Sequence, residues 1–135
     1  ETAAAHNCVL AMEPNPAIYG GNYVLRFQEA LQVAQAVDHP GLRINFDLGC
    51  MIANGEGVEG LSEHVPWISH VHISEPRLVP IDTAAHTPLI RRLFQELHEG
   101  GYRHTVSLEM GCLKGDAPMK RLAAILSTVK SLASA

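Results

Sequence analysis

Short apolar segments alternate with helical patterns four times along this chain, and this alternation restricts its fold more than any other feature. The strand-like segments are Cys8–Glu13, Leu42–Asp47, His70–Ser74 and Tyr102–Glu109. The segments between and after them have helical patterns, with apolar side chains three and four residues apart as on one buried helix face. Strands and helices in strict alternation favour parallel strands joined by right-handed crossovers. The sequence therefore predicts an α/β fold with four βα units.

The expected helices and loops follow from local signals. We expect helices over 23–37, in a short segment before Pro66, from 87 to the Gly100-Gly101 pair, and from Pro118 onward. Thr87 is predicted to cap the third of these, with Pro88 at its first position. The strand ending at Asp47 runs into Leu48–Met51, and a glycine-rich loop through Gly55, Gly57 and Gly60 is expected to follow. The long loop 75–85 is a candidate functional loop, because loops of that length in compact domains often carry function.

Four polar side chains come at equivalent ends of these strands. In the stretch 70–76, Val71 and Ile73 point to one face and His70, His72 and Ser74 to the other, because side chains alternate along a strand. The other three strands each end in an acid. In a parallel sheet these ends meet at one edge, so we expect a metal site formed by Glu13, Asp47, His72 and Glu109. Such oxygen-rich ligands suit Mn²⁺ or Mg²⁺, with Co²⁺ or Zn²⁺ as alternatives.

Composition excludes several classes of function. The net charge is −4 and the ten Lys and Arg residues are scattered, which disfavours a nucleic-acid partner. The three cysteines, Cys8, Cys50 and Cys112, form no CxxC pair and are typical of reduced thiols in a cytoplasmic protein. No apolar run is as long as a membrane span, so no membrane partner is expected. Nucleotide-binding glycine motifs are absent, which disfavours hydride transfer.

Four motifs carry a resemblance to a known family. They are Met12–Pro16 (MEPNP), Phe46–Gly49 (FDLG), His70–Pro76 (HVHISEP) and Ser107–Met110 (SLEM). Together they resemble the xylose isomerase-like (β/α)₈ barrel family, and more narrowly its sugar phosphate isomerase/epimerase branch. The resemblance covers the whole chain, with the motifs in family order. In that family the last four strands carry the metal ligands, and this implies the ligand set Glu13, Asp47, His72 and Glu109.

The resemblance also implies that the chain is half of a TIM barrel. A full barrel needs about 250 residues, and the motifs match strands five to eight. We therefore expect residues 1–135 to form a single domain, a C-terminal half-barrel, that belongs to a longer protein. Four strands of a barrel have two unpaired edges, which favour pairing with another chain. The expected partner is a second copy or the missing N-terminal half.

The chemistry implied by the resemblance is sugar isomerisation or epimerisation through an enediolate. Glu13 and Glu109 are the candidate catalytic pair, one removing a carbon-bound proton and the other returning it. Arg77, His86, Lys114 and Cys50 are candidate substrate-binding residues. Cys50 stands where ketose 3-epimerases of the family carry a histidine, which counts against a ketohexose 3-epimerase. Nothing nearby in the sequence lowers the pKa of Cys50, so no nucleophilic role is expected.

Other interpretations remain open. A catalytically silent half-barrel would associate with another chain and at most bind metal. Lyase or dehydratase chemistry would use the same enediolate, whereas apurinic endonuclease-like repair would need more ligands and a basic face. Among single residues, His70 is expected to be a core histidine with a backbone partner, and Glu75, beside Pro76, to be a turn residue.

Overall fold

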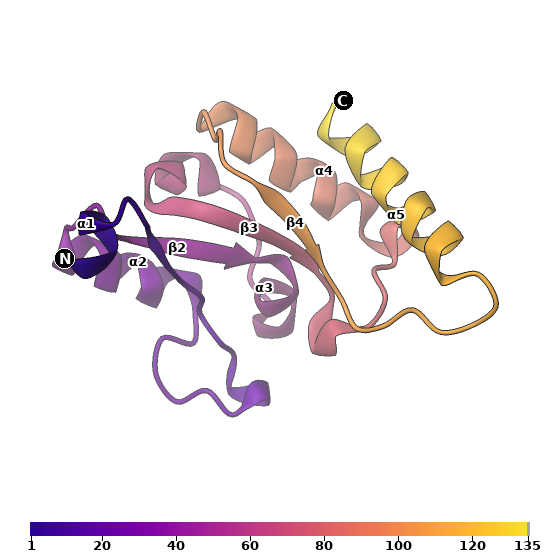
Figure 1. The fold of residues 1–135 in the computed structure, drawn as a ribbon, viewed down its shortest axis with the longest axis horizontal. Helices are drawn as coiled ribbons and strands as arrows, with labels where there is room; N and C mark the ends of the chain where they lie inside the picture. Colours follow the sequence, from indigo (N-terminus) through magenta and orange to yellow (C-terminus); the bar gives the residue numbers. More distant parts are fainter. Residues whose placement is uncertain (135) are drawn as a thin grey trace.

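Four parallel strands form one sheet, which confirms the predicted α/β class (Figure 1). The structure is a computed structural model that describes residues 1–134. The strands follow one another across the sheet in chain order and are β1 (Leu10–Met12), β2 (Leu42–Asp47), β3 (Ile68–Ser74) and β4 (Val106–Glu109). Such an arrangement is that of successive strands in a barrel wall, here forming an open arc.

A short helix precedes the first strand, and further helices connect the strands and follow the last one. The α-helices are α1 (Thr2–Ala5), α2 (Phe27–Val37), α3 (Leu48–Asn54), α4 (Thr83–Glu99) and α5 (Pro118–Ala133). Short 3₁₀ helices lie in the connections: η1 (Ala17–Tyr19), η2 (Leu61–Trp67) and η3 (Pro76–Leu78). Figure 1 shows α4 and α5 running side by side beyond β4, and the two helices are in contact.

The two faces of the sheet differ in polarity. On one face Phe46 and Val71 are almost completely buried, and they belong to the same core as Leu31 of α2 and Leu93 of α4. Full burial of such a side chain contributes about 1.5–3 kcal/mol, so this face holds the domain together. The opposite face carries polar side chains, among them His72 and its neighbours along and across the strands. The strand alternation thus directs His72 and the other polar side chains of these strands to the face opposite Phe46 and Val71.

The start of α4 differs from the prediction. Asp82, and not Thr87, is its N-cap, because the Asp82 carboxylate accepts hydrogen bonds from the amides of Ala84 (3.1 Å) and Ala85 (3.2 Å). Pro88 therefore lies inside the helix and not at its first position. The earlier start of α4, together with η3, also makes the loop after β3 much shorter than the predicted 75–85 segment.

A second difference lies directly after β2. Leu48–Asn54 forms the helix α3, which the sequence analysis did not predict. The Asp47 carboxylate accepts a hydrogen bond from the Cys50 amide at 2.6 Å and so caps this helix. Four smaller errors are at element starts. Helix α2 begins at Phe27 and not at residue 23, and β4 begins at Val106 and not at Tyr102. Strand β1 begins at Leu10 and not at Cys8, and β3 begins at Ile68 and not at His70.

The outer strands β1 and β4 each pair on one side only. Near β1, Val9 and Leu10 are 47% and 65% exposed, which is unusual for apolar side chains of a sheet. Among the described residues, no helix has the length and apolar character needed to cross a membrane.

Candidate metal centre

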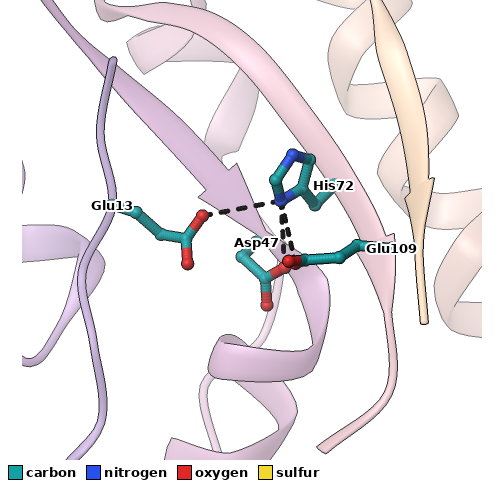
Figure 2. Close-up of side chains that lie close together, drawn as sticks. All are labelled: Glu13, Asp47, His72 and Glu109. Atoms are coloured by element: carbon teal, nitrogen blue, oxygen red, sulfur yellow. Dashed lines mark ion pairs between the residues drawn. The ribbon is translucent and has the colours of Figure 1, made fainter. Parts of the chain in front are cut away.

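The structure brings together the four side chains predicted as ligands (Figure 2). Glu13, Asp47, His72 and Glu109 each offer one donor atom, and these atoms all lie within 4.8 Å of one another. His72 is central: its Nδ1 atom lies 3.0 Å from Oε2 of Glu109, 3.5 Å from Oε2 of Glu13 and 3.6 Å from Oδ2 of Asp47. We refer to these four residues as the quartet.

Strand register places the quartet at one end of the sheet. Asp47 is the residue opposite His72 in the ladder between β2 and β3, and Glu109 is opposite Ser74 between β3 and β4. Glu13 directly follows β1, whose last residue pairs with Ile44. Parallel pairing in this register is sufficient to bring side chains together from positions that span almost a hundred residues of sequence.

The Asp47 carboxylate is buried and fixed on both of its oxygens. Oδ1 accepts the Cys50 amide, and Oδ2 accepts the Ser74 hydroxyl at 2.7 Å. The Ser74 hydroxyl in turn accepts the Gly49 amide at 2.8 Å. Gly49 is required by space, because a Cβ there would lie 2.6 Å from the Ser74 hydroxyl oxygen and 2.8 Å from the Glu75 carbonyl carbon. The start of α3 thus packs directly against the end of β3.

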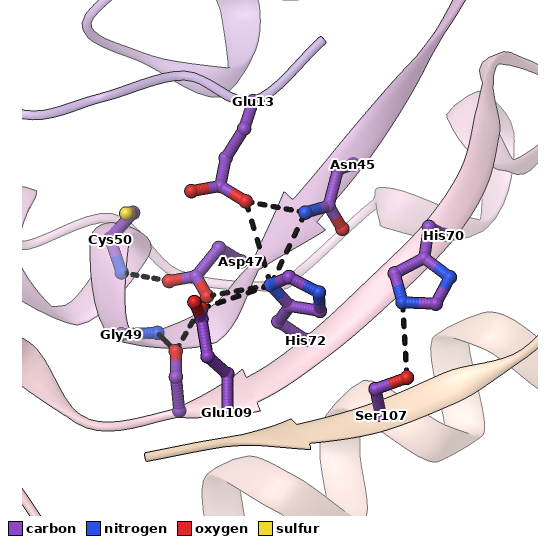
Figure 3. A network of polar contacts seen from close by, with 10 residues as sticks. Glu13, Asn45, Asp47, Gly49, Cys50, His70, His72, Ser107 and Glu109 are labelled. Atoms are coloured by element: carbon purple, nitrogen blue, oxygen red, sulfur yellow. Dashed lines mark hydrogen bonds and ion pairs between the residues drawn. The ribbon is translucent and has the colours of Figure 1, made fainter. Parts of the chain in front are cut away.

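Asn45 contacts the quartet and was not among the site residues predicted from the sequence. Its side-chain amide nitrogen donates to Oε2 of Glu13 and lies 3.2 Å from Nδ1 of His72 (Figure 3). Its Oδ1 is buried and has no hydrogen-bond partner among the described residues. Asn45 lies two residues before Asp47 and therefore on the same face of β2, so the alternation of the strand contained the signal.

His70, one pleat away from His72, contacts a hydroxyl and not the predicted backbone group. Its Nε2 atom lies 3.1 Å from Oγ of Ser107. Burial lowers the pKa of His70, and the neighbouring His72 lowers it further. A neutral His70 imidazole therefore lies beside the quartet without adding positive charge.

The electrostatics of the quartet favour a bound cation. Burial raises the pKa of Glu13, and the Asp47 and Glu109 carboxylates raise it further, against the opposing effects of His72 and Asn45. Three carboxylates close to one imidazole therefore repel one another when ionised. Hard oxygen donors with one imidazole are a donor set that fits Mn²⁺ or Mg²⁺, so the residues present fit such an ion.

A cleft of about 230 Å³ opens beside the quartet. It is lined by Glu13, Asn15, Tyr19, Asp47, Cys50, Glu75, Leu78 and Glu109. Cys50 is only 7% exposed, and burial, followed by the Asp47 charge, raises its thiol pKa. The cysteine at this wall is therefore a neutral thiol.

The other predicted substrate-binding residues do not line this cleft. The side chains of Arg77 and Lys114 are exposed, and neither residue lines the cleft. His86 is partly buried and contacts Glu75, which does line it. Their role in binding substrate stays a prediction.

The backbone after β3 is strained next to the cleft. Arg77 and Leu78 have φ values of 61° and 53°, in a region that costs a non-glycine residue on the order of 1–3 kcal/mol. Two contacts hold this conformation: the Arg77 amide donates to the Tyr19 hydroxyl at 2.6 Å, and the Leu78 carbonyl accepts the Gly111 amide at 2.7 Å. Strain that the surroundings maintain in this way is typical of functional sites.

Comparison with known proteins agrees with this architecture. A family model described as xylose isomerase-like TIM barrel matches residues 1–132. Among solved structures, the 3-keto-D-glucoside 4-epimerase YcjR from E. coli, in its apo form, superposes with a TM-score of 0.78 at 19% identity, over 96% of this chain and 48% of that one. An AP endonuclease of family 2 from Brucella melitensis gives a TM-score of 0.67 at 23% identity, over 92% and 48%. No curated protein matches the chain significantly.

The chain thus spans about half the length of both structural neighbours. At these identities the likeness shows the fold alone. Four parallel βα units, half the length of barrel proteins, are consistent with a half-barrel.

Proposed function

Because the chain belongs to the xylose isomerase-like TIM barrel family, we propose that it contributes the metal-binding half of an isomerase or epimerase that acts on sugars or sugar phosphates. The observation that carries this proposal is the quartet, in which four donor atoms from the ends of four strands lie within 4.8 Å of one another. The structural likeness to an epimerase is consistent with it.

Glu13, Asp47, His72 and Glu109 would hold the ion, with Mn²⁺ or Mg²⁺ favoured. When bound, a divalent cation supplies positive charge that stabilises the enediolate oxygens of the sugar. Asp47 would help to hold the ion and would not exchange a proton with the sugar, because hydrogen bonds already fix both of its oxygens.

Glu13 and Glu109 are the proposed acid and base. One carboxylate takes the proton from a carbon next to the carbonyl, and the electron pair of that C–H bond stays on the sugar as the enediolate. The other, protonated, glutamic acid returns a proton to the opposite face in an epimerase or to the neighbouring carbon in an isomerase.

Substrate would be bound by His86 and Cys50 near the cleft and by Arg77 and Lys114 in the exposed loops. Cys50 already lines the cleft. Arg77 and Lys114 would contact a substrate phosphate or hydroxyl only after side-chain movement, because both are exposed outside the cleft lining.

Solvent exchange tests this function directly. The full-length protein with Mn²⁺ is incubated in D₂O with a panel of ketoses and their phosphate esters, and deuterium at the carbon next to the carbonyl is followed by NMR. Exchange is expected for at least one sugar. It should fall by about 100-fold or more in Glu13→Gln and Glu109→Gln, and persist in the matched surface control Glu99→Gln. Absence of exchange with every sugar contradicts the proposal.

A catalytically silent half-barrel is the second candidate. It is favoured by the apolar side chains of Val9 and Leu10, which are exposed at and beside β1. Metal binding and association with a second copy or an N-terminal half, without deuterium exchange, are its expected results. DNA repair is less well supported, because the net charge of −4 opposes phosphate binding.

A further inference from the structure

Glu75 is a buried carboxylate that the proposed reaction does not use. It directly follows β3, is 6% exposed, and lines the same cleft as Glu13, Asp47 and Glu109. We propose that Glu75, held in place by His86, binds a hydroxyl group in the uncharged part of the sugar substrate. This inference rests on the proposed function, since it assigns a role to another wall of the same cleft.

The two oxygens of Glu75 have different surroundings. Oε1 lies 2.6 Å from Nδ1 of His86 and accepts the Asp82 amide at 3.3 Å. Oε2 accepts no hydrogen bond from any residue that the structure describes. An ionised carboxylate can accept hydrogen bonds on both oxygens, and Oε2 of Glu75 is not among the fully buried atoms that lack a partner in the described residues. The free oxygen of a residue that lines the cleft is therefore available to a ligand.

The position of Glu75 is fixed from several sides. Its backbone packs against Gly49, where a Cβ would lie 2.8 Å from the Glu75 carbonyl carbon. The next turn is held by the contact of the Arg77 amide with the Tyr19 hydroxyl. His86, in the first turns of α4, holds the side chain itself. A group held this firmly can orient a ligand with little loss of side-chain entropy on binding.

The chemistry of the cleft selects the kind of group that fits. A hydroxyl donates to a carboxylate, whereas a phosphate or carboxylate would be repelled by it. No Lys or Arg lines the cleft among the described residues, so nothing there offsets that repulsion. Tyr19 and Leu78 lie in the same lining and offer apolar contact to sugar C–H groups. The Glu75 carboxylate would accept hydrogen bonds from sugar hydroxyls, and the apolar side chains beside it would contact the C–H groups of the same uncharged carbon chain.

Binding of sugar and metal by the full-length protein separates this inference from the proposed function. Mn²⁺ affinity is measured first, and the Mn²⁺-loaded protein is then titrated with D-fructose, D-psicose, D-tagatose and D-sorbose by water-proton relaxation. Glu75→Gln keeps the size of the side chain and an oxygen for His86. It is expected to weaken binding of the preferred ketose about tenfold, while the Mn²⁺ dissociation constant changes by less than about twofold.

His86→Asn provides a second variant in case Glu75→Gln does not fold, and its expected effect is a smaller loss of ketose affinity with Mn²⁺ affinity retained. Glu99→Gln is the charge-matched control on exposed α4 surface and should bind both ligands like the wild type. Unchanged ketose affinity in Glu75→Gln, or in His86→Asn where only that variant folds, overturns the Glu75 assignment alone. Failure of the wild type to bind Mn²⁺ overturns the proposed function, and this inference with it. Binding of Mn²⁺ without binding of any of the four ketoses overturns this inference alone.

Discussion

The Ser74 hydroxyl donates a hydrogen bond of 2.7 Å to Oδ2 of Asp47 and thereby ties the end of β3 to the end of β2. Because Oδ1 of Asp47 also caps α3, one carboxylate joins two strands and a helix at the edge where the quartet lies. The donor atoms are thus placed by local folding before any ion binds, which reduces the cost of ordering them on binding.

Gly49→Ala is expected to disturb this junction. The added Cβ would lie 2.6 Å from the Ser74 hydroxyl oxygen and 2.9 Å from the Glu75 carbonyl oxygen, so backbone must shift. We expect a loss of about 1–3 kcal/mol in the free energy of unfolding, measured in urea, as for other overpacked sites. In Gly57→Ala the three atoms nearest to the new Cβ all belong to the flexible end of the Glu59 side chain, and that control should be close to neutral. Equal free energies of unfolding for Gly49→Ala and the wild type would contradict this expectation.

Asn45→Leu is expected to weaken metal binding. Its amide orients the Glu13 carboxylate, and loss of such a supporting hydrogen bond typically costs about 10- to 100-fold in metal affinity. Calorimetry with Mn²⁺ measures the change. Ser107→Ala, which removes a contact to His70 but none to the quartet, is the control and should bind normally. Equal Mn²⁺ affinities of Asn45→Leu and the wild type would show that Asn45 does not support metal binding.

The raised pKa of Glu13 predicts a pH dependence for the metal-free protein. The folded state holds the Glu13 proton at pH values where the unfolded state, with a pKa near 4.5, has lost it. The contribution of Glu13 to stability is therefore fully present below pH 4.5 and is lost as the pH rises through the raised pKa. Urea unfolding in EDTA across this range, compared with Glu13→Gln, isolates the effect. A difference between the two proteins that is independent of pH would contradict it.

Glu96 predicts the opposite pH dependence at a purely structural site. The buried Glu96 carboxylate accepts the amides of Ser62 (2.9 Å) and Gly60 (3.2 Å) and pairs with Arg92. Burial opposes its ionisation, but these bonds prevail and lower the pKa of Glu96. Its stabilisation is present above the unfolded pKa near 4.5 and is lost as the pH falls through the lowered value.

Glu96→Ala should therefore destabilise the fold at neutral pH by about 1–3 kcal/mol for each buried amide left without a partner. Chemical unfolding at pH 7 and at acid pH measures the loss, which should shrink in acid. Glu99→Gln on the same helix serves as its control. A loss that is the same at both pH values would rule out the ionised carboxylate as its source.

The sequence was sufficient for the parallel α/β arrangement and for the convergence of the quartet. Alternation along each strand decides which side chains share a face, and parallel pairing brings strand ends together, so Asp47 and His72 could be placed without coordinates. The residues that support the quartet were harder to find. Asn45 followed the same alternation, but its importance depends on its distance from Glu13, which only the fold supplies.

Glu75 and the start of α4 show the limits of local reasoning. Glu75 does begin the turn after β3, as Pro76 indicated, because its carbonyl accepts the Leu78 amide. Its contact with His86, however, brings together a strand end and a later helix. Thr87 followed by Pro88 is typical of a helix start. The Asp82 carboxylate, however, accepts hydrogen bonds from the Ala84 and Ala85 amides, and the helix begins there. Glu96, mid-helix, gave no signal, because its partners lie in η2. Each of these depends on tertiary contacts between distant segments.

The central claim is that the quartet binds one divalent metal ion, and Mn²⁺ titration of the purified protein followed by EPR tests it most directly. The account predicts about one tightly bound Mn²⁺ per chain, lost in His72→Ala and in Asp47→Asn, with both variants retaining the circular dichroism of the wild type. Less than about a tenth of an equivalent bound by the wild type, or full binding by both variants, would contradict it.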